Sequence, residues 1–382
     1  MIHISSKLPS GDTTIFTEMS ALAQQYQAIN LGQGFPDFDP PTDLIRCVQE
    51  TTAMHHHQYA PMAGDKSLRA IISQKIESLY GSSFDPISEI TITAGATQAL
   101  FTAITAFIRS GDEVIIFEPA YDSYRPSIIL AGGITVPYTL YAPDFNIDWD
   151  NLKRLITDKT KMIIINTPNN PTATVFNAQD WKKLDEILTG TQIIVLSDEV
   201  YEHLIFDGCP HESVLKYPHL RDRSMAVFSF GKTFHCTGWK IGYCVGSEYL
   251  MQEFRKVHQW NVFSVNSILQ KALATYMADP QSYQNIAKFY EVKRDYFRQI
   301  LADTSFKPLD VQGTFFQLCD YSAYSDMDDR SFAKNMVIHH GVAAIPLSPF
   351  YNHENEGTLI RFCFAKSTEL LDQAAKKLRN IH

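Results

Sequence analysis

Short runs of isoleucine and valine, repeated along the middle of the chain, constrain its fold more than any other sequence feature. Clear examples are Asp112–Phe117 (DEVIIF), Lys161–Asn166 (KMIIIN) and Gln192–Ser197 (QIIVLS). These runs lack polar alternation, which is typical of strands buried on both faces of a mostly parallel sheet. Helical patterns separate them, as crossover connections between parallel strands require. The sequence therefore predicts an α/β fold whose sheet is sandwiched by helices.

Residues 89–302 carry this pattern throughout. Further strands are predicted at Glu89–Thr93, Ile134–Leu140, Ser224–Ser229 and Lys240–Val245. Helices are predicted at Ala96–Arg109, Tyr124–Leu130, Ser267–Ala278 and Tyr283–Ala302. The Pro- and Gly-rich segment Asn30–Pro41 has no regular period and is expected to cross between two units.

A smaller α+β unit is predicted after residue 302. Its strands are Gly313–Cys319 and Leu359–Ala365, and its helices are Ser331–His340 and Thr368–Arg379. A chain of 382 residues also exceeds one compact core of ordinary size. We expect residues 1–45 to form an N-terminal arm and part of the small domain, 46–280 the large domain, and 281–382 the small C-terminal domain.

Charge and cysteine usage exclude several kinds of partner. The formal net charge of −9 repels phosphodiester backbones and anionic lipid, so we expect neither a nucleic acid nor a membrane partner. The first residues lack the apolar core of a secretory signal, and the six cysteines form no C-x-x-C pair. These features predict a cytoplasmic protein with reduced thiols. Adjacent positions such as His55–His57 diverge on a helix, and we expect no metal.

Small and polar residues follow the predicted strands at the points where the strands end. Gly95, Ala96 and Thr97 come directly before a helix, whose N-terminal N–H groups and dipole favour an anion such as phosphate. The same residues also begin many ordinary helices. Asn169 and Asn170 lie between two prolines, which predicts either a pair of presented amides or only a rigid turn.

Two more strands end in residues that suit acid–base and amine chemistry. Asp198 and Tyr201 follow one strand, where a buried carboxylate needs a positive partner such as a protonated ring nitrogen. Asp198 could instead cap a helix. Lys232 follows another, where burial would lower the amine pKa and favour nucleophilic chemistry, although most lysines are solvated. Ser229 and Lys240 flank it and together suit a phosphate.

These candidates form one set because ligands of open α/β sheets sit beyond the carboxyl ends of the strands. Jointly they supply a phosphate cradle, a carboxylate, a phenol, an amide and an amine at successive strand ends. That inventory is what pyridoxal phosphate requires.

The same motifs resemble the fold-type I, class I/II aminotransferases, which have the aspartate aminotransferase-like fold. The segment from Ser229 to Gly242 resembles the family's lysine-attachment motif, and Asn169-Asn170-Pro171 and Asp198-Glu-Val-Tyr201 precede it at the family's usual separations. The resemblance extends from Gln33-Gly-Phe-Pro-Asp-Phe38 to Ile360-Arg-Phe362. Many relatives have Arg where this chain has Lys240, so a charge contact to phosphate is implied rather than a bidentate one.

The resemblance implies a role for each candidate in transamination with pyridoxal phosphate. Lys232 carries the cofactor as a Schiff base and then moves the Cα proton, Asp198 keeps the pyridine nitrogen protonated, and Tyr201 and Asn170 bind the ring 3-oxygen. The phosphate is held by Gly95, Ala96, Thr97, Ser229, Lys240 and Tyr59 of the partner subunit, and Tyr121 stacks on the ring. Arg361 grips the substrate carboxylate, assisted by Gly34 and Asn170. A homodimer is therefore implied.

Narrower motifs favour the branch of glutamine/kynurenine and bacterial methionine aminotransferases. They are Gln33–Phe38, Glu118–Tyr124, Val257–Gln259 and Phe263–Asn266. Matching positions imply a substrate side-chain pocket formed by Phe16, Thr97, Tyr121, Phe350 and Phe263 of the partner subunit. Such aromatic walls suit methionine, phenylalanine, glutamine or kynurenine better than aspartate, although buried aromatics also serve as plain core.

The residues leave one other function open and argue against two more. A C–S β-lyase for cysteine conjugates would use the same site. A non-catalytic regulator that binds pyridoxal phosphate usually has an added DNA-binding segment, and only about thirty residues precede Gln33. A nicotinamide dehydrogenase would need a G-x-G-x-x-G motif after a strand, which is missing.

Overall fold

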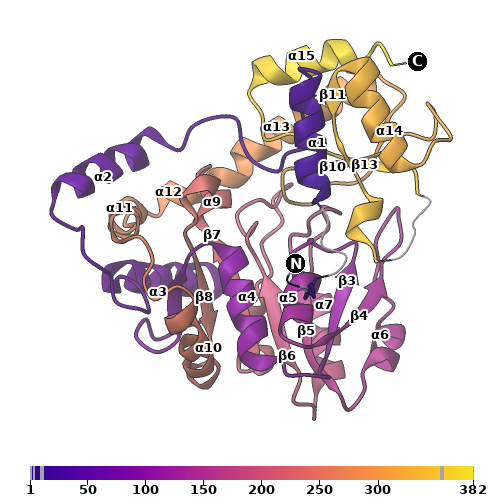
Figure 1. Ribbon diagram of the computed structural model, residues 1–382. Coiled ribbons are helices and arrows are strands. Elements are labelled where there is room, and N and C mark those ends of the chain that lie inside the picture. Colours follow the sequence, from indigo (N-terminus) through magenta and orange to yellow (C-terminus); the bar gives the residue numbers. More distant parts are fainter. Residues whose placement is uncertain (1, 3–4, 9–12, 353–356, 382) are drawn as a thin grey trace.

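A seven-stranded sheet forms the centre of the larger part of the molecule (Figure 1). The computed structural model describes residues 2, 5–8, 13–352 and 357–381. The strand order is β2-β8-β7-β6-β5-β3-β4, and only β8 runs antiparallel to its neighbours in this sheet. The strands are β2 (Ile90–Thr93), β3 (Glu113–Glu118), β4 (Ile134–Thr139), β5 (Thr160–Asn166), β6 (Ile194–Asp198), β7 (Ser224–Ser229) and β8 (Gly242–Gly246). The predicted mostly parallel sheet is confirmed.

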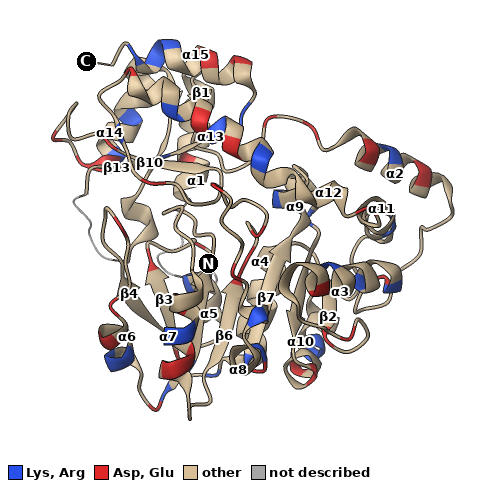
Figure 2. Ribbon diagram, turned by 180° about the vertical axis from the view of Figure 1, so that it is seen from behind, with Lys and Arg blue, Asp and Glu red and all other residues tan. Residues whose placement is uncertain are grey.

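Alternate residues of the central strands enter two apolar clusters, so the sheet is buried on both faces. On β5, Ile163 and Ile165 belong to one cluster, whereas Met162 and Ile164 belong to the other. Helices α3 (Lys66–Tyr80), α6 (Trp149–Leu155) and α7 (Ala178–Leu188) cover the first face, and α4 (Ala96–Phe107), α5 (Tyr124–Leu130) and α10 (Glu248–Asn261) cover the second. Figure 2 shows the charged residues mostly on outer helices and turns rather than on the strands.

A second group of elements lies above this sheet in Figure 1. It contains a four-stranded antiparallel sheet of order β12-β13-β10-β9 and a parallel pair, β1 with β11. Its strands are β1 (Ile29–Asn30), β9 (Lys307–Pro308), β10 (Phe316–Asp320), β11 (Val342–Ala343), β12 (Ile345–Pro346) and β13 (Leu359–Cys363). Its helices are α1 (Ile15–Gln25), α13 (Ile286–Ala302), α14 (Asp329–Asn335) and α15 (Thr368–Leu378).

Several predicted elements differ from the structure at their ends. The single helix expected at residues 283–302 is two helices, α12 (Gln281–Gln284) and α13, because the backbone leaves the helical region at Asn285. The strand expected from Gly313 begins only at β10, since Thr314 has a φ of 67°. The strand expected from Lys240 begins at β8 for the same reason, with a φ of 55° at Lys240. The helix expected at residues 331–340 ends in a π-helical turn, Met336–His340.

Other helices were not predicted. They are α1, α2 (Thr42–Ala53), α3, α6, α7, α8 (Pro218–Arg221), α9 (Phe230–Thr233) and α10, whereas α11 (Ser267–Met277) follows its prediction. The proposed domain limits stay a prediction: the first falls inside α2 and the second at the start of α12. Within the described ranges, no helix is long and apolar enough to cross a membrane.

Candidate active site

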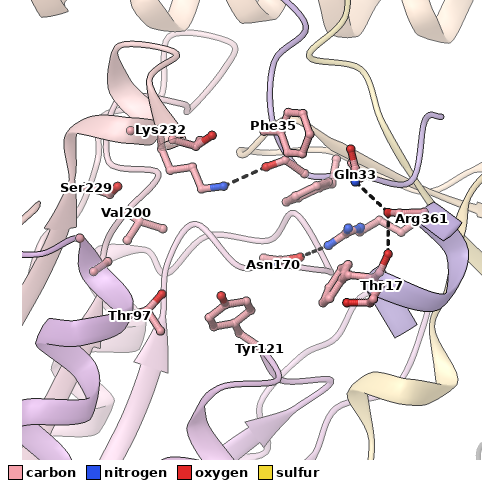
Figure 3. A pocket seen from close by; sticks show the side chains of 18 of the residues that line it. Thr17, Gln33, Phe35, Thr97, Tyr121, Asn170, Val200, Ser229, Lys232 and Arg361 are labelled. Carbon is pink, nitrogen blue, oxygen red and sulfur yellow. Dashed lines mark hydrogen bonds between the residues drawn. The ribbon is translucent and has the colours of Figure 1, made fainter. Parts of the chain in front are cut away.

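A cavity of about 1040 Å³ lies between the two groups of elements, at the carboxyl ends of the parallel strands. Parallel strands end at one edge of a sheet, so residues far apart in sequence meet there. The cavity is lined by most of the predicted site residues: Phe16, Gly34, Gly95, Ala96, Thr97, Tyr121, Asn170, Asp198, Tyr201, Ser229, Lys232, Lys240 and Arg361. Figure 3 shows several of them converging on the same space from different elements.

Lys232 lies in the single turn of α9, directly after β7. Its Nζ donates a hydrogen bond to the carbonyl oxygen of Gly34 at 2.9 Å (Figure 3). It also lies 5.6 Å from the ring centre of Tyr201 and 5.3 Å from that of Phe315. Burial among these groups lowers the pKa of Lys232 to about 8, so the amine loses its proton far more readily than an exposed lysine.

Asp198 is the last residue of β6 and is only 3% exposed. The hydroxyl of Tyr124 donates to its Oδ2 at 2.6 Å, and the Val200 N–H reaches Oδ1 at 3.4 Å. Burial raises the pKa of Asp198 to about 6 against these hydrogen bonds and the nearby Lys232. A carboxylate in this state gains strongly from a cation in the cavity.

Arg361 on β13 is 1% exposed and presents its guanidinium to the cavity. Its Nη1 donates to Oδ1 of Asn170 at 2.5 Å, and its Nη2 donates to the carbonyl oxygen of Gly32 at 3.0 Å. Its Nε has no hydrogen-bond partner among the described residues. The Phe316 ring lies 3.9 Å from the guanidinium carbon. Burial lowers the pKa of Arg361 only to about 10, so the group stays cationic at neutral pH.

An anion cradle lies at the start of α4. Gly95 precedes this twelve-residue helix with a φ of 78°, a conformation that favours glycine. A Cβ built on Gly95 would make ordinary contacts with Lys240, at 3.4 Å from its Cε and 3.5 Å from its Nζ, so the two residues are neighbours. The Lys240 amine therefore lies beside free backbone N–H groups of a helix N-terminus, an arrangement that suits phosphate.

Three predicted residues lie outside this cavity. Tyr59 is 79% exposed and Phe263 is 50% exposed, and their rings meet edge to face at 5.1 Å. Phe350 is buried behind the site, with its ring 5.7 Å from that of Phe16, and it lines a smaller cavity instead. Its ring centre also lies 5.4 Å from the guanidinium carbon of Arg361, so Phe350 packs against Arg361 as well as Phe16.

Some lining or supporting residues were missed from the sequence. Thr17 and Ser20 reach the cavity from α1, and Gln33 donates to the Ser20 hydroxyl at 2.8 Å. A helix could have been predicted there because Thr14 is a typical N-cap residue. Tyr124 was recognised only as part of a motif, and nothing local in the sequence indicates its bond to Asp198.

Comparisons with known proteins identify the family of the chain. The sequence profile of the family "Aminotransferase class I and II" matches residues 26–378. The chain is 50% identical over 377 residues to methionine aminotransferase of Escherichia coli, covering 98% of both chains. It is 34% identical over 407 residues to kynurenine–oxoglutarate transaminase 1 of Mus musculus, covering 97% of this chain and 96% of that protein.

Solved structures give the same result for the fold. An E. coli protein whose structure identified a methionine aminotransferase function superposes with a TM-score of 0.97 at 50% identity, covering 99% of this chain and all of that one. The N-succinyldiaminopimelate aminotransferase of Mycobacterium tuberculosis superposes with a TM-score of 0.96 at 34% identity, with full coverage of both. The predicted aspartate aminotransferase-like fold is confirmed, and the chain belongs to the class I and II aminotransferases.

Proposed function

We propose that this aminotransferase uses pyridoxal phosphate to move the amino group of a methionine-type amino acid onto a 2-oxo acid. The observation that carries the proposal is the pairing of Lys232 with Asp198 in one cavity. An amine whose pKa is lowered to about 8 and a buried carboxylate whose pKa is raised to about 6 face the same space. Class I aminotransferases as a family depend on this cofactor.

The residues present fit the cofactor at each of its polar groups. We assign its phosphate to the Gly95–Thr97 backbone, Ser229 and Lys240, and its pyridine nitrogen to Asp198. Oδ1 of Asn170 already accepts from Arg361, which leaves the Asn170 amide nitrogen to donate to the ring 3-oxygen beside Tyr201. Tyr121 would stack on the ring. When bound, the cofactor supplies an electron sink that stabilises negative charge at the substrate Cα.

Lys232 has two tasks in this proposal. Its unprotonated amine holds the cofactor aldehyde, and after the substrate amine has replaced it, it takes the proton from Cα. The lowered pKa suits both tasks, because a base works best when its pKa lies near the working pH. The Gly34 carbonyl oxygen orients the free amine before the cofactor binds.

Arg361 is the proposed carboxylate site. Its planar guanidinium is held in advance by Asn170, Gly32 and the Phe316 ring, so little side-chain entropy is lost when a carboxylate binds. Nε has no partner among the described residues and is available to a ligand.

The substrate class follows from the walls of the cavity and from the relatives. Among the described lining residues, the cations are Lys232, Lys240 and Arg361, each already assigned to another group. A second side-chain carboxylate would find no arginine there, whereas Phe16 and Tyr121 suit thioether, aromatic or amide side chains. The 50% identical relative is a methionine aminotransferase, so methionine is the preferred donor in this proposal. Phenylalanine, glutamine and kynurenine are the next candidates.

We also propose a homodimer in which Tyr59 and Phe263 complete the site of the partner subunit. The exposure of both rings, which lie outside their own cavity, supports this assignment. Dilution until the protein is monomeric should abolish activity, as followed by light scattering and turnover of the same samples. A fully active monomer would disprove it.

A spectral titration of the purified holoenzyme tests the proposed function. The cofactor's visible band should be lost on addition of methionine but not of aspartate, and a 2-oxo acid should restore it. Lys232→Ala should retain cofactor but lose roughly 10²–10⁴-fold or more in kcat, the range that a general base contributes. A colourless protein that cannot be reconstituted, or near-normal turnover by Lys232→Ala, contradicts the proposal. Pyruvate release from a cysteine conjugate without a 2-oxo acid would indicate a β-lyase instead.

A further inference from the structure

The turn after β6 contains two buried carboxylates that face away from the cavity. Asp198 and Tyr201 line the cavity, whereas Glu199 and Glu202 do not. Glu199 and Glu202 are nevertheless 0% and 6% exposed. Burying a carboxylate is unfavourable unless charged or hydrogen-bonding partners satisfy it. The partners of these two glutamates therefore show how the turn is held.

Glu199 ties the turn to the segment that follows it. Its Oε1 accepts from the Ser197 hydroxyl at 2.7 Å and from the Val214 N–H at 3.1 Å, and its Oε2 meets Nε2 of His211 at 2.7 Å. These contacts fix the backbone on the Asp198 side of the turn.

Glu202 ties the Tyr201 side of the turn to more distant elements. Its Oε1 accepts from Lys75 Nζ at 2.5 Å and from the Tyr243 hydroxyl at 3.1 Å, and its Oε2 accepts from the Tyr80 hydroxyl at 2.5 Å. The side chains of Lys75 and Glu202 are only 2% and 3% exposed. Burial opposes ionisation of Glu202, but Lys75, together with His203 and the Tyr80 hydroxyl, outweighs it and lowers the pKa of Glu202 to about 2. Lys75 and Glu202 therefore form a buried ion pair.

The same ion pair reaches the strand that leads to Lys232. Tyr243 on β8 accepts a second hydrogen bond from Lys75 Nζ, at 2.8 Å. Its ring stacks on that of Phe228 on β7, with centres 4.8 Å apart and planes 16° apart. Phe228 immediately precedes Ser229, and α9 with Lys232 follows. Helix α3, which carries Lys75, lies beside β8 in Figure 1.

Stability alone is a weak reason for such a pair. Replacing a buried ion pair by apolar groups of similar size is often neutral or stabilising, whereas its geometry restricts how the neighbouring backbone can lie. Tyr201 is the residue before Glu202, so a shift of the Glu202 backbone displaces the Tyr201 hydroxyl. Displacements of about 1 Å at an active site can lower rates on the order of 10²-fold.

We propose that Glu202, with Lys75 and Tyr243, positions Tyr201 relative to Lys232 and so sets the geometry of amino transfer. The inference rests on the function proposed above, in which Tyr201 contacts the cofactor. These three are positioning residues, since none of them lines the cavity.

The experiment leaves intact the titratable groups that lie near Tyr201, which include Arg361, Asp198, Tyr121, Cys363 and Lys232. It uses the holoenzyme and two single variants, Tyr243→Phe and Glu202→Gln. Tyr217→Phe is the matched control, because its hydroxyl donates to Glu212 at 2.8 Å outside the cavity. The double variant Lys75→Met/Glu202→Gln removes both charges; the Gln carbonyl oxygen can accept from one of the Tyr80 and Tyr243 hydroxyls, and the other hydroxyl can accept from the Gln amide. The measurements are kcat, KM, the cofactor dissociation constant and the pH midpoint of the cofactor's visible band.

If Tyr201 is displaced, the effect should appear in kcat and in the pH midpoint of the cofactor band rather than in KM. Glu202→Gln should lower kcat by about 10²-fold, with KM changed less than about threefold. The band midpoint should rise by about one pH unit as the Tyr201 hydrogen bond to the ring oxygen weakens. Tyr243→Phe should also lower kcat and raise the band midpoint, each by less than Glu202→Gln does. The double variant should be more active than Glu202→Gln.

Each alternative outcome is decisive. If Tyr243→Phe and the double variant match Tyr217→Phe in kcat and band midpoint, the positioning role is wrong, even where Glu202→Gln does not fold. A folded double variant as slow as Glu202→Gln would also overturn it, because relief of the unpaired Lys75 charge should restore part of the geometry. A parent protein without any cofactor band would instead refute the proposed function itself.

Discussion

The hydrogen bond from Tyr124 to Asp198 leads to a prediction that depends on pH. Tyr124→Phe removes the hydroxyl that donates to Oδ2 at 2.6 Å in a fully buried pair. The pKa of Asp198 is already raised to about 6 by burial, and this hydrogen bond acts against that rise. The variant should therefore raise the pKa of Asp198 further.

The size of the pKa rise depends on how strongly the Tyr124 hydroxyl binds the charged and the neutral forms of Asp198. A hydrogen bond to a charged group contributes about 1.5–3 kcal/mol and one to a neutral group about 1 kcal/mol. The difference of about 0.5–2 kcal/mol corresponds to a pKa rise of roughly 0.5–1.5 units.

The sign follows from the folded and unfolded pKa values of Asp198. A pKa raised in the folded state contributes stability at low pH, which is lost as the pH rises from about 4 to about 6. Below this range both proteins hold a neutral Asp198, so the variant loses about 1 kcal/mol of unfolding free energy. At pH 8 the carboxylate is ionised in both, and the loss should grow to about 1.5–3 kcal/mol.

Urea unfolding of the apoenzyme between pH 5 and 8 measures this difference. Tyr138→Phe is a suitable control, because its hydroxyl donates at 2.9 Å to the backbone carbonyl oxygen of Asp148, which does not titrate. The control should lose the same stability at every pH. A Tyr124→Phe difference that is equally independent of pH would refute the assigned role of this hydrogen bond.

Three other changes test separate parts of the site. Arg361→Lys should raise KM for the amino acid by roughly 10–100-fold in steady-state kinetics. The reason is the loss of one charge-assisted hydrogen bond of the planar guanidinium, which contributes about 1.5–3 kcal/mol. An unchanged KM would show that the substrate carboxylate binds elsewhere. Gly34→Ala should raise KM and lower the melting temperature, because its Cβ would lie 2.8 Å from Phe316 Cζ and overpacking costs about 1–3 kcal/mol. An unchanged KM and melting temperature would show that the backbone of residues 33–35 moves freely. Recombination of apoenzyme with cofactor, followed in a stopped-flow spectrometer, should accelerate as pH rises through about 8, where Lys232 loses its proton; a rate that falls over this range would contradict the lowered pKa.

Local sequence patterns predicted the large sheet well. The helix expected at Tyr124–Leu130 has those ends in α5, and Ser224–Ser229 has those ends in β7. Such segments are governed by apolar periodicity, which each stretch of sequence carries by itself. The prediction of one helix over residues 283–302 was wrong because the break at Asn285 is a backbone conformation that periodicity does not report.

The site could be predicted as a set of residues but not as a geometry. Lys232, Asp198 and Asn170 were recognised because they lie at or just after the ends of strands and match family motifs. Their immediate partners come from other elements: Gly34 for Lys232, Tyr124 for Asp198, and Arg361 for Asn170, which is 191 residues away. The contacts of Phe350 with Phe16 and with the Arg361 guanidinium likewise come from the packed structure, because a motif does not give the direction of a side chain.

The sequence by itself determined the fold class, the family and the order of the candidate residues along the strand ends, because these depend on local pattern and motif spacing. Only the tertiary structure decided which groups are buried together, and burial sets their chemistry. Lys232 is an ordinary amine in sequence, but desolvation lowers its pKa to about 8. Glu202 is an ordinary carboxylate in sequence, but contacts from α3 and β8 make it a buried ion that holds the turn of Tyr201. Desolvation and long-range contacts arise only when the chain is packed, so no local pattern could have specified them.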